Sequence, residues 1–277
     1  MNSVAKIQRF SPAPAVALSI AGSDSSGGAG IQADLRAFDA FGVFGCSALT
    51  AITAQNTLGV TRVKVLEPAL VAAQIKACLD DLPVAAIKTG MLAAAATIEA
   101  VTGMLQHCAR SARLPPIVVD PVMIATSGAR LLDEDAVDLL RTRLLPLATL
   151  VTPNLHEAAA LTGLSIDTDP RRLGRALLRT GVRSILVKGG HGKSAESCDW
   201  LIRGGEERPF RRNRIAGSFH GTGCALSAAI AAGLAGGDAV DTAIEQAREW
   251  LHGRIEQAFR PLAGSLGVLP FGPARRL

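Results

Sequence analysis

The segment that decides the fold is Ile215 to Leu234, IAGSFHGTGCALSAAIAAGL. From Ala225 onward it is a run of small apolar residues, which predicts a buried helix. The glycine turn Gly221 to Cys224 comes directly before this run and therefore forms the N-terminus of that helix. Backbone N–H groups without intrahelical partners and the helix dipole attract an anion at such an end, and glycine lets the main chain approach it closely. We therefore expect this turn to bind a phosphoryl group.

Cys224 lies in the first turn of the expected helix. The electrostatic field at a helix N-terminus lowers the pKa of a thiol, so Cys224 is a candidate thiolate base. An alternative fits the spacing equally well: a glycine-capped core helix that carries an inert, buried cysteine.

Length and composition predict one large domain. The chain has 277 residues, of which 48% are hydrophobic, and this is enough to bury a single large core. No block of like charge or low-complexity linker interrupts the apolar segments. We expect an N-terminal extension over residues 1–14, a single domain over 15–260 and an irregular C-terminal tail over 261–277.

Charge and cysteine usage narrow the classes of partner. The net charge is +5, but the Lys and Arg residues are scattered and no aromatic residues alternate with them, so we expect no nucleic-acid partner. No apolar run approaches the roughly 20 residues of a membrane span. The five cysteines include no C-x-x-C pair, which argues against a disulfide framework or a zinc site. We expect a cytoplasmic protein without a membrane partner, and a homodimer.

Strand and helix patterns alternate along the chain, which predicts a mostly parallel sheet with helices on both faces. The expected strands are Ala15 to Ala21, Cys46 to Ala54, Val60 to Leu66, Val84 to Lys88, Ile117 to Val119, Leu150 to Thr152 and Ser184 to Lys188. The expected helices are Ile31 to Phe41, Pro68 to Leu82, Ala93 to His107, Glu134 to Leu144, Asn154 to Thr162 and Arg171 to Thr180. A hairpin is expected around Gly204-Gly205.

Ligands of such sheets bind beyond the carboxyl ends of the strands. Five polar clusters follow expected strands: Gly22 to Gly30, Thr89 to Met91, Asp120 to Met123, Pro153 to Glu157, and Lys188 to His191. The first is glycine-rich but matches neither G-x-G-x-x-G nor G-x-x-x-x-G-K-[ST], so we expect a loop that contacts a small ligand through its backbone.

Asp34 and Gln55 are candidate ligand contacts with simpler alternatives. Asp34 would project from the first helical turn as a hydrogen-bond acceptor, but a carboxylate there is also favoured by the helix dipole alone. Gln55 belongs to the polar cluster Gln55-Asn56-Thr57, which could bind a heterocycle or form an ordinary turn.

Seven motifs together resemble one enzyme family. They are AGSDSSGGAGIQADLRAF, TAQNTLGV, KTGML, DPVM, VTPNLHEAAALTG, VKGGH and HGTGC, in this order between Val16 and Trp250. The set resembles the hydroxymethylpyrimidine and phosphomethylpyrimidine kinases of thiamine biosynthesis, which implies an α/β fold, a ribokinase-like three-layer α/β/α sandwich with a mostly parallel central sheet. Two alternatives stay open: a pyridoxal kinase of the same fold and a non-catalytic pyrimidine-binding regulator.

The resemblance also implies roles for individual residues. It implies a pyrimidine pocket lined by Gly22, Asp34, Gln55, Met91 and Val122, and a Mg²⁺ site at Asp120 and Glu157. It implies ATP contacts from Asn154, Lys188 and Thr222, and a catalytic group of Cys224, Lys188, Gly221 and Gly223. One departure is Thr126, because the family often has a lysine there.

Overall fold

A nine-stranded sheet crosses the centre of the protein. The computed structural model describes residues 13–111, 114–124, 131–189, 195–262, 264 and 266–272; Thr126, Gly190 and His191 lie outside them. Within them the strand order is β3-β2-β1-β4-β5-β6-β7-β8-β9. The strands are β1 Val16–Asp24, β2 Phe44–Asn56, β3 Gly59–Val65, β4 Val84–Thr89, β5 Ile117–Val119, β6 Leu150–Val151, β7 Ile185–Val187, β8 Glu196–Arg203 and β9 Glu206–Asn213.

The central strands of this sheet are parallel, and its edges are antiparallel. β2, β1, β4, β5, β6 and β7 pair in parallel. β3 pairs antiparallel with β2 at one edge, and the β8–β9 hairpin pairs antiparallel with β7 at the other. Parallel strands end at the same side of a sheet, so the polar clusters that follow them are brought together.

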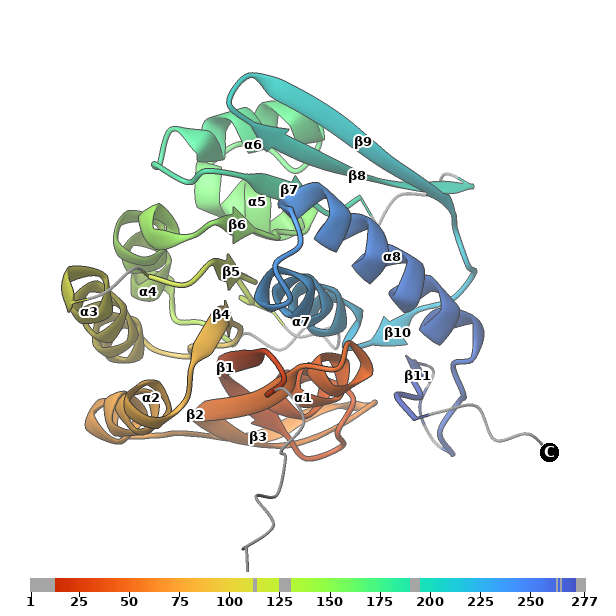
Figure 1. Ribbon diagram of the computed structural model, residues 1–277. Helices are drawn as coiled ribbons and strands as arrows, with labels where there is room; N and C mark the ends of the chain where they lie inside the picture. The colour runs from red at the N-terminus through yellow and green to blue at the C-terminus, as the bar shows by residue number, and fades with distance from the viewer. Residues whose placement is uncertain are drawn as a thin grey trace, which may run out of the picture.

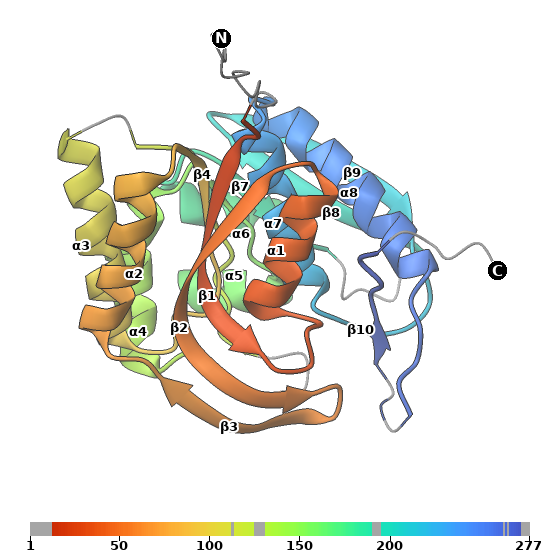
Figure 2. The same ribbon diagram turned by 60° about the horizontal axis from the view of Figure 1, so that its bottom comes forward.

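Helices cover both faces of the sheet (Figures 1 and 2). One layer holds α1 Gly30–Ala40, α7 Thr222–Ala235 and α8 Val240–Glu256; the other holds α2 Pro68–Asp81, α3 Ala95–Ser111, α4 Glu134–Leu139, α5 Leu155–Thr162 and α6 Pro170–Leu178. A π-helical turn, Leu140–Leu144, continues α4. This arrangement is the three-layer α/β/α sandwich that the sequence predicts.

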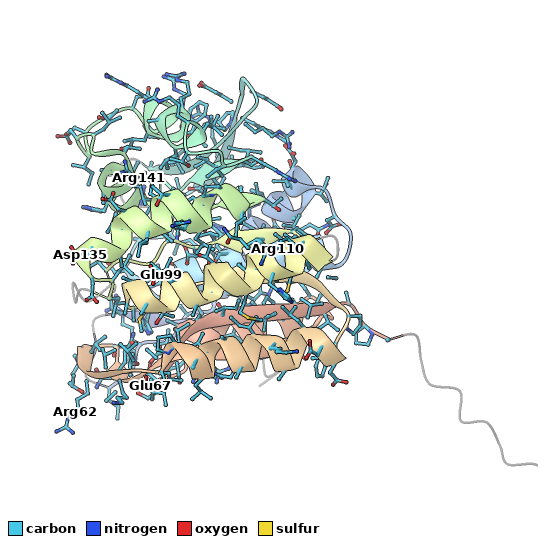
Figure 3. All side chains as sticks on the ribbon, turned by 90° about the vertical axis from the view of Figure 1, so that its left-hand side faces the viewer. Arg62, Glu67, Glu99, Arg110, Asp135 and Arg141 are labelled. Carbon is cyan, nitrogen blue, oxygen red and sulfur yellow. The ribbon has the colours of Figure 1, made fainter. Side chains whose placement is uncertain are left out.

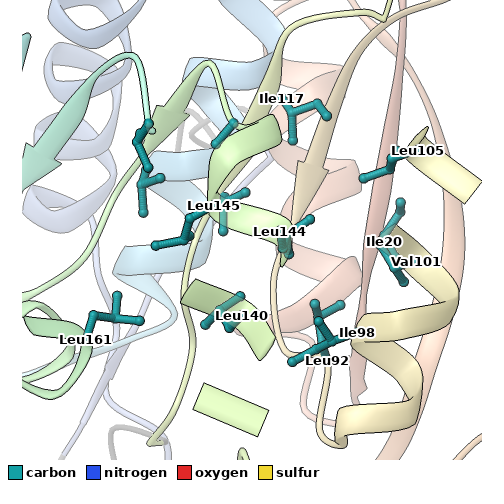
Figure 4. Packing of buried hydrophobic residues seen from close by; sticks show 14 of the residues in the cluster. Ile20, Leu92, Ile98, Val101, Leu105, Ile117, Leu140, Leu144, Leu145 and Leu161 are labelled. Atoms are coloured by element: carbon teal, nitrogen blue, oxygen red, sulfur yellow. The ribbon is translucent and has the colours of Figure 1, made fainter. Parts of the chain in front are cut away.

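The alternation of side chains along each strand divides the core in two. In β1, Leu18 and Ile20 face the α2–α6 layer, whereas Ala17 faces α1, α7 and α8. Figure 4 shows Ile20 beside Ile98 and Val101 of α3. Successive strand residues point to opposite faces, so a sheet covered on both sides needs apolar residues at both sets of positions.

The helix layers differ in how polar they are. On α3, Glu99 and Arg110 are exposed (Figure 3), while Ile98 and Val101 are buried. In α7, by contrast, every residue from Ala225 to Ala235 is buried, because the sheet lies on one side of it and α1 and α8 on the other. A helix that is apolar all round belongs in the interior. No helix in the described ranges is both long and apolar enough to span a bilayer.

Some elements have no counterpart among the expected ones. α8 has an apolar stripe that includes Ala243, Ile244, Ala247 and Leu251, yet no helix was expected there. Two-residue strands, β10 Phe219–His220 and β11 Gly267–Val268, pair in parallel. β11 lies in the segment expected to be irregular. Only the folded chain shows that these two segments pair.

Candidate active site

A cavity of about 900 Å³ lies at the carboxyl ends of the parallel strands. Its lining includes residues from the ends of β1, β2, β5, β6 and β7, and from the first turn of α7. Every predicted site residue except Asp34 lines it: Gly22, Gln55, Met91, Asp120, Val122, Asn154, Glu157, Lys188, Gly221, Thr222, Gly223 and Cys224. The topology of the sheet thus gathers residues from positions 22 to 224 of the chain.

The N-terminus of α7 opens into this cavity. Gly221 is the N-cap residue and has a φ of 76°, in the left-handed region that favours glycine. A Cβ atom at Gly221 would lie 1.8 Å from the carbonyl oxygen of Gly28, so only glycine fits. The first N–H groups of a helix have no intrahelical partner. Those of residues 222–224 are therefore available to an anion, as the sequence predicts.

Lys188 and Asp120 form an ion pair beside this helix end. The Lys188 ammonium donates to Asp120 Oδ1 at 2.8 Å, and the Thr152 hydroxyl donates to the same oxygen at 3.2 Å. Burial opposes charge on both groups, yet their mutual attraction outweighs it: the pKa of Lys188 is raised and that of Asp120 is lowered. A Cβ atom at Gly223 would lie 3.2 Å from Lys188 Nζ. A positive charge therefore lies directly against the first turn of α7.

Glu157 is a buried carboxyl group held by the start of α5. Its Oε2 accepts the Asn154 N–H at 2.8 Å, and Asn154 Oδ1 accepts the Glu157 N–H at 2.9 Å, forming a capping box. The pKa of Glu157 is raised to about 7. Burial is the main cause, the negative charge of Asp120 adds to it, and the positive charge of Lys188 opposes it. Glu157 thus caps the start of α5 and also lines the cavity.

Cys224 differs from the sequence prediction in its acidity. Burial raises the pKa of its thiol to about 11, against the lowering effects of the Lys88 charge and of a hydrogen bond from the backbone of Gly30. The negative charges of Asp120 and Asp34 raise this pKa further, so burial and these charges outweigh the two effects that favour a thiolate. At neutral pH the side chain is a thiol, which contradicts the predicted thiolate.

Asp34 is placed differently from the substrate-facing position that the sequence suggests. Its carboxylate is fully buried, accepts two hydrogen bonds from Lys88 Nζ at 2.9 and 2.8 Å, and accepts the Ser19 hydroxyl at 2.6 Å. A buried charge needs such partners, and Lys88 supplies the opposite one. Burial lowers the pKa of Lys88, but the carboxylates of Asp34 and Asp120 raise it by more.

The remaining predicted residues form a small apolar wall with an amide beside it. Met91 packs with Ala51 and Val122. A Cβ atom at Gly22 would lie 2.7 Å from the Met91 methyl carbon, so the glycine makes room for that side chain. The Gln55 amide, at the end of β2, lies next to this wall on the same cavity. A flat, polar heterocycle matches such a surface.

Several residues of the cavity lining were not predicted, and two groups of them show why. Asp24 and His220 lie in the quoted motifs, and their contact, from His220 Nε2 to Asp24 Oδ2 at 2.7 Å, is visible only in the folded chain. Leu251, His252 and Ile255 line the cavity from α8. The helical spacing of apolar residues in α8 is the signal that would have found this second group.

Two solved kinases have the same architecture as this chain. A Bacillus subtilis pyridoxal kinase, solved as an ADP complex, is 34% identical with a TM-score of 0.83, over 93% of this chain and 97% of that one. A phosphomethylpyrimidine kinase from Clostridium difficile is 39% identical with a TM-score of 0.75, over 87% of this chain and 99% of that one. Fold and site together therefore define a kinase of the ribokinase-like class.

Sequence relatives specify the family within this class. The family model for phosphomethylpyrimidine kinase matches residues 24–268. A hydroxymethylpyrimidine/phosphomethylpyrimidine kinase of Rhizobium meliloti is 50% identical over 250 residues, which cover 89% of this chain and 92% of that protein. The chain belongs to the phosphomethylpyrimidine kinase family and is a phosphotransferase. The resemblance seen in the motifs is confirmed.

Proposed function

We propose that this protein uses ATP to phosphorylate hydroxymethylpyrimidine and then phosphorylates the monophosphate to the diphosphate, in thiamine diphosphate biosynthesis. The observation that carries the proposal is a shared cavity. The apolar wall around Met91 and the amide of Gln55 open into the same space as Lys188 and the first turn of α7. An acceptor ring and a transferring phosphoryl group can therefore meet there.

The acceptor ring lies against Met91 and Val122 and hydrogen-bonds to Gln55. An amide offers one acceptor oxygen and two N–H donors, which suit the exocyclic amine and the ring nitrogens of an aminopyrimidine. The backbone of Gln55 is held by Ser25, whose hydroxyl donates to the Gln55 carbonyl at 2.8 Å and accepts its N–H at 2.9 Å. The main chain at Gln55 is thus tied to the glycine-rich loop.

The triphosphate lies between Lys188 and the N-terminus of α7, with Asn154 and Thr222 beside it. In the transfer step the acceptor oxygen bonds to the γ-phosphorus, the bond from that phosphorus to the bridging oxygen breaks, ADP leaves, and the hydroxyl proton is released. Transfer of this kind depends on position and charge neutralisation more than on covalent catalysis. Lys188 and the backbone N–H groups of residues 222–224 supply both.

Mg²⁺ fits the same end of the cavity. No cluster of three or more His, Cys, Asp or Glu in the described residues could hold a metal, but Mg²⁺ is usually bound by one or two carboxylates, waters and substrate phosphates. Asp120 is paired with Lys188 at 2.8 Å, and Glu157 lines the same cavity. They would hold the ion, which neutralises phosphate charge when bound.

The second phosphorylation needs no proton transfer from the acceptor. A phosphate monoester already carries about −1.5 to −2 charges near neutral pH, so its oxygen is a nucleophile without a base. The raised pKa of Cys224 is compatible with this step, because no thiolate is needed.

The pyridoxal kinase alternative is tested by comparing acceptors. We expect kcat/KM for hydroxymethylpyrimidine to exceed that for pyridoxal by at least about tenfold, since one lost or misplaced buried hydrogen bond costs about 1–3 kcal/mol. The assay uses purified protein with ATP and Mg²⁺ and measures ADP release on each acceptor separately. A higher value for pyridoxal would replace the proposed substrate. Absence of ADP release with either acceptor would favour the binding-regulator alternative.

We also propose that the protein is a cytoplasmic homodimer. Exposed apolar side chains on the β2–β3 edge, Ile52, Leu58 and Val63, support a self-contact there. Light scattering on the purified protein measures its mass; a mass of one chain at micromolar concentration would exclude the dimer.

A further inference from the structure

The glycine-rich loop, residues 22–30, packs closely against the turn at the N-terminus of α7, residues 221–224. A Cβ atom at Gly28 would lie 2.4 Å from the His220 ring, and one at Gly221 would lie 1.8 Å from the Gly28 carbonyl oxygen. The loop leads into α1 and the turn leads into α7, so the contact fixes the N-termini of two helices against each other.

One buried carboxylate organises this contact. Asp24 Oδ1 accepts the N–H and the hydroxyl of Ser26, both at 2.8 Å. Asp24 Oδ2 accepts the Ala29 N–H at 2.8 Å and pairs with His220 Nε2 at 2.7 Å. Ser26 and Ala29 belong to the loop, whereas His220 immediately precedes the turn. Asp24 is thus the link between them.

The loop and the turn that Asp24 joins also contact residues on both the acceptor side and the phosphoryl side of the proposed reaction. Gln55, on the acceptor side, is tied to the loop through Ser25 and places its Nε2 3.5 Å from His220 Nε2. Cys224, on the phosphoryl side, receives a hydrogen bond from the backbone of Gly30, at the end of the loop. Burial raises the pKa of Asp24, but hydrogen bonds from His220 and Ser26 hold it below its usual range, so the link is charged at neutral pH.

We propose that Asp24 and His220 are positioning residues that lock the glycine-rich loop to the N-terminus of α7, so that the acceptor and the transferring phosphoryl group are held in one geometry. The proposal deepens the kinase function and rests on it. A displacement of about 1 Å between reacting groups can lower a rate by about 10²-fold, and the lock prevents such a displacement.

The test replaces His220 with a residue that lacks the N–H and with one that retains it. His220→Leu removes the donor to Asp24. In His220→Gln the side-chain amide nitrogen can stand where Nε2 stands and donate to the same oxygen. His107→Leu on α3, an exposed site away from the cavity, is the control. If His220→Leu does not fold, His220→Asn replaces it, because its shorter amide does not reach Asp24.

Two readouts separate positioning from general stability. We expect His220→Leu to speed amide hydrogen exchange in the loop, residues 22–30, by at least about tenfold, with peptides of α3 unchanged. We expect its kcat to fall about 10²-fold while both KM values change less than about threefold. His220→Gln should restore loop protection and most of kcat.

The outcomes that overturn the proposal are equally specific. Unchanged loop exchange in His220→Leu, or equal damage by Gln and Leu, would show that the hydrogen bond does not lock the loop. The exchange readout requires no turnover, so it stands even if the wild-type protein fails to phosphorylate hydroxymethylpyrimidine. That failure would overturn the proposed function, whereas altered exchange would still show the lock.

Discussion

At the residue scale, Cys224 shows how burial can reverse an expectation drawn from sequence. Its place at a helix N-terminus predicts a lowered thiol pKa, but burial raises that pKa to about 11. How deeply a side chain is buried depends on the whole fold, so a motif of four residues cannot predict it. The same reason applies to Asp34: the motif gives the carboxylate, but only the folded sheet brings Lys88 to it.

The raised pKa gives a prediction for Cys224→Ala. If the thiol is not the base, the variant should lose activity by similar factors on hydroxymethylpyrimidine and on its monophosphate. A general base is typically worth about 10² to 10⁴ in rate, so a loss larger by that factor on the hydroxymethyl acceptor would contradict this prediction. The measurement is kcat on each acceptor with ATP and Mg²⁺. Cys224→Ser serves as the control that keeps a small polar group.

At the element scale, α7 is the element that the sequence predicts best. Its apolar run, its glycine N-terminus and its burial are all readable from the segment Ile215 to Leu234, because a helix buried on every side must be apolar on every side. α8 could have been found from its spacing. β10 and β11 could not, since they form a separate two-stranded sheet that the alternation of strands and helices does not predict.

The two ends of α7 offer a matched pair of glycines. Gly221 and Gly237 both have positive φ, 76° and 93°, but a Cβ atom meets the Gly28 carbonyl at the first and nothing within 4 Å at the second. We expect Gly237→Ala to cost about 1–2 kcal/mol of unfolding free energy and to leave kcat within about twofold. Gly221→Ala has the same backbone cost and, in addition, a clash with the Gly28 carbonyl oxygen.

We therefore expect Gly221→Ala to destabilise the protein by more than Gly237→Ala does and to lower kcat by about 10²-fold, because the glycine turn at the start of α7 must move. Urea unfolding and steady-state kinetics on both variants measure these effects. Equal effects of the two substitutions on kcat would show that the turn's close packing is irrelevant to transfer.

At the scale of the whole molecule, function depends on the convergence of strand ends. The order of motifs along the chain predicts which residues meet, since parallel strands end on one side of the sheet. It does not predict contacts between the motifs, such as Asp24 with His220 or Lys188 with Asp120. Those contacts depend on side-chain directions that are set by packing across several elements.

The central claim is that this cavity carries out two successive phosphoryl transfers to one pyrimidine. Phosphorus NMR of the purified protein with ATP, Mg²⁺ and hydroxymethylpyrimidine tests it most directly. We predict a monophosphate ester signal that appears first and then declines as the signals of a diphosphate ester grow, with two ADP formed per pyrimidine consumed. Accumulation of the monophosphate alone, or no ester at all, would contradict the account.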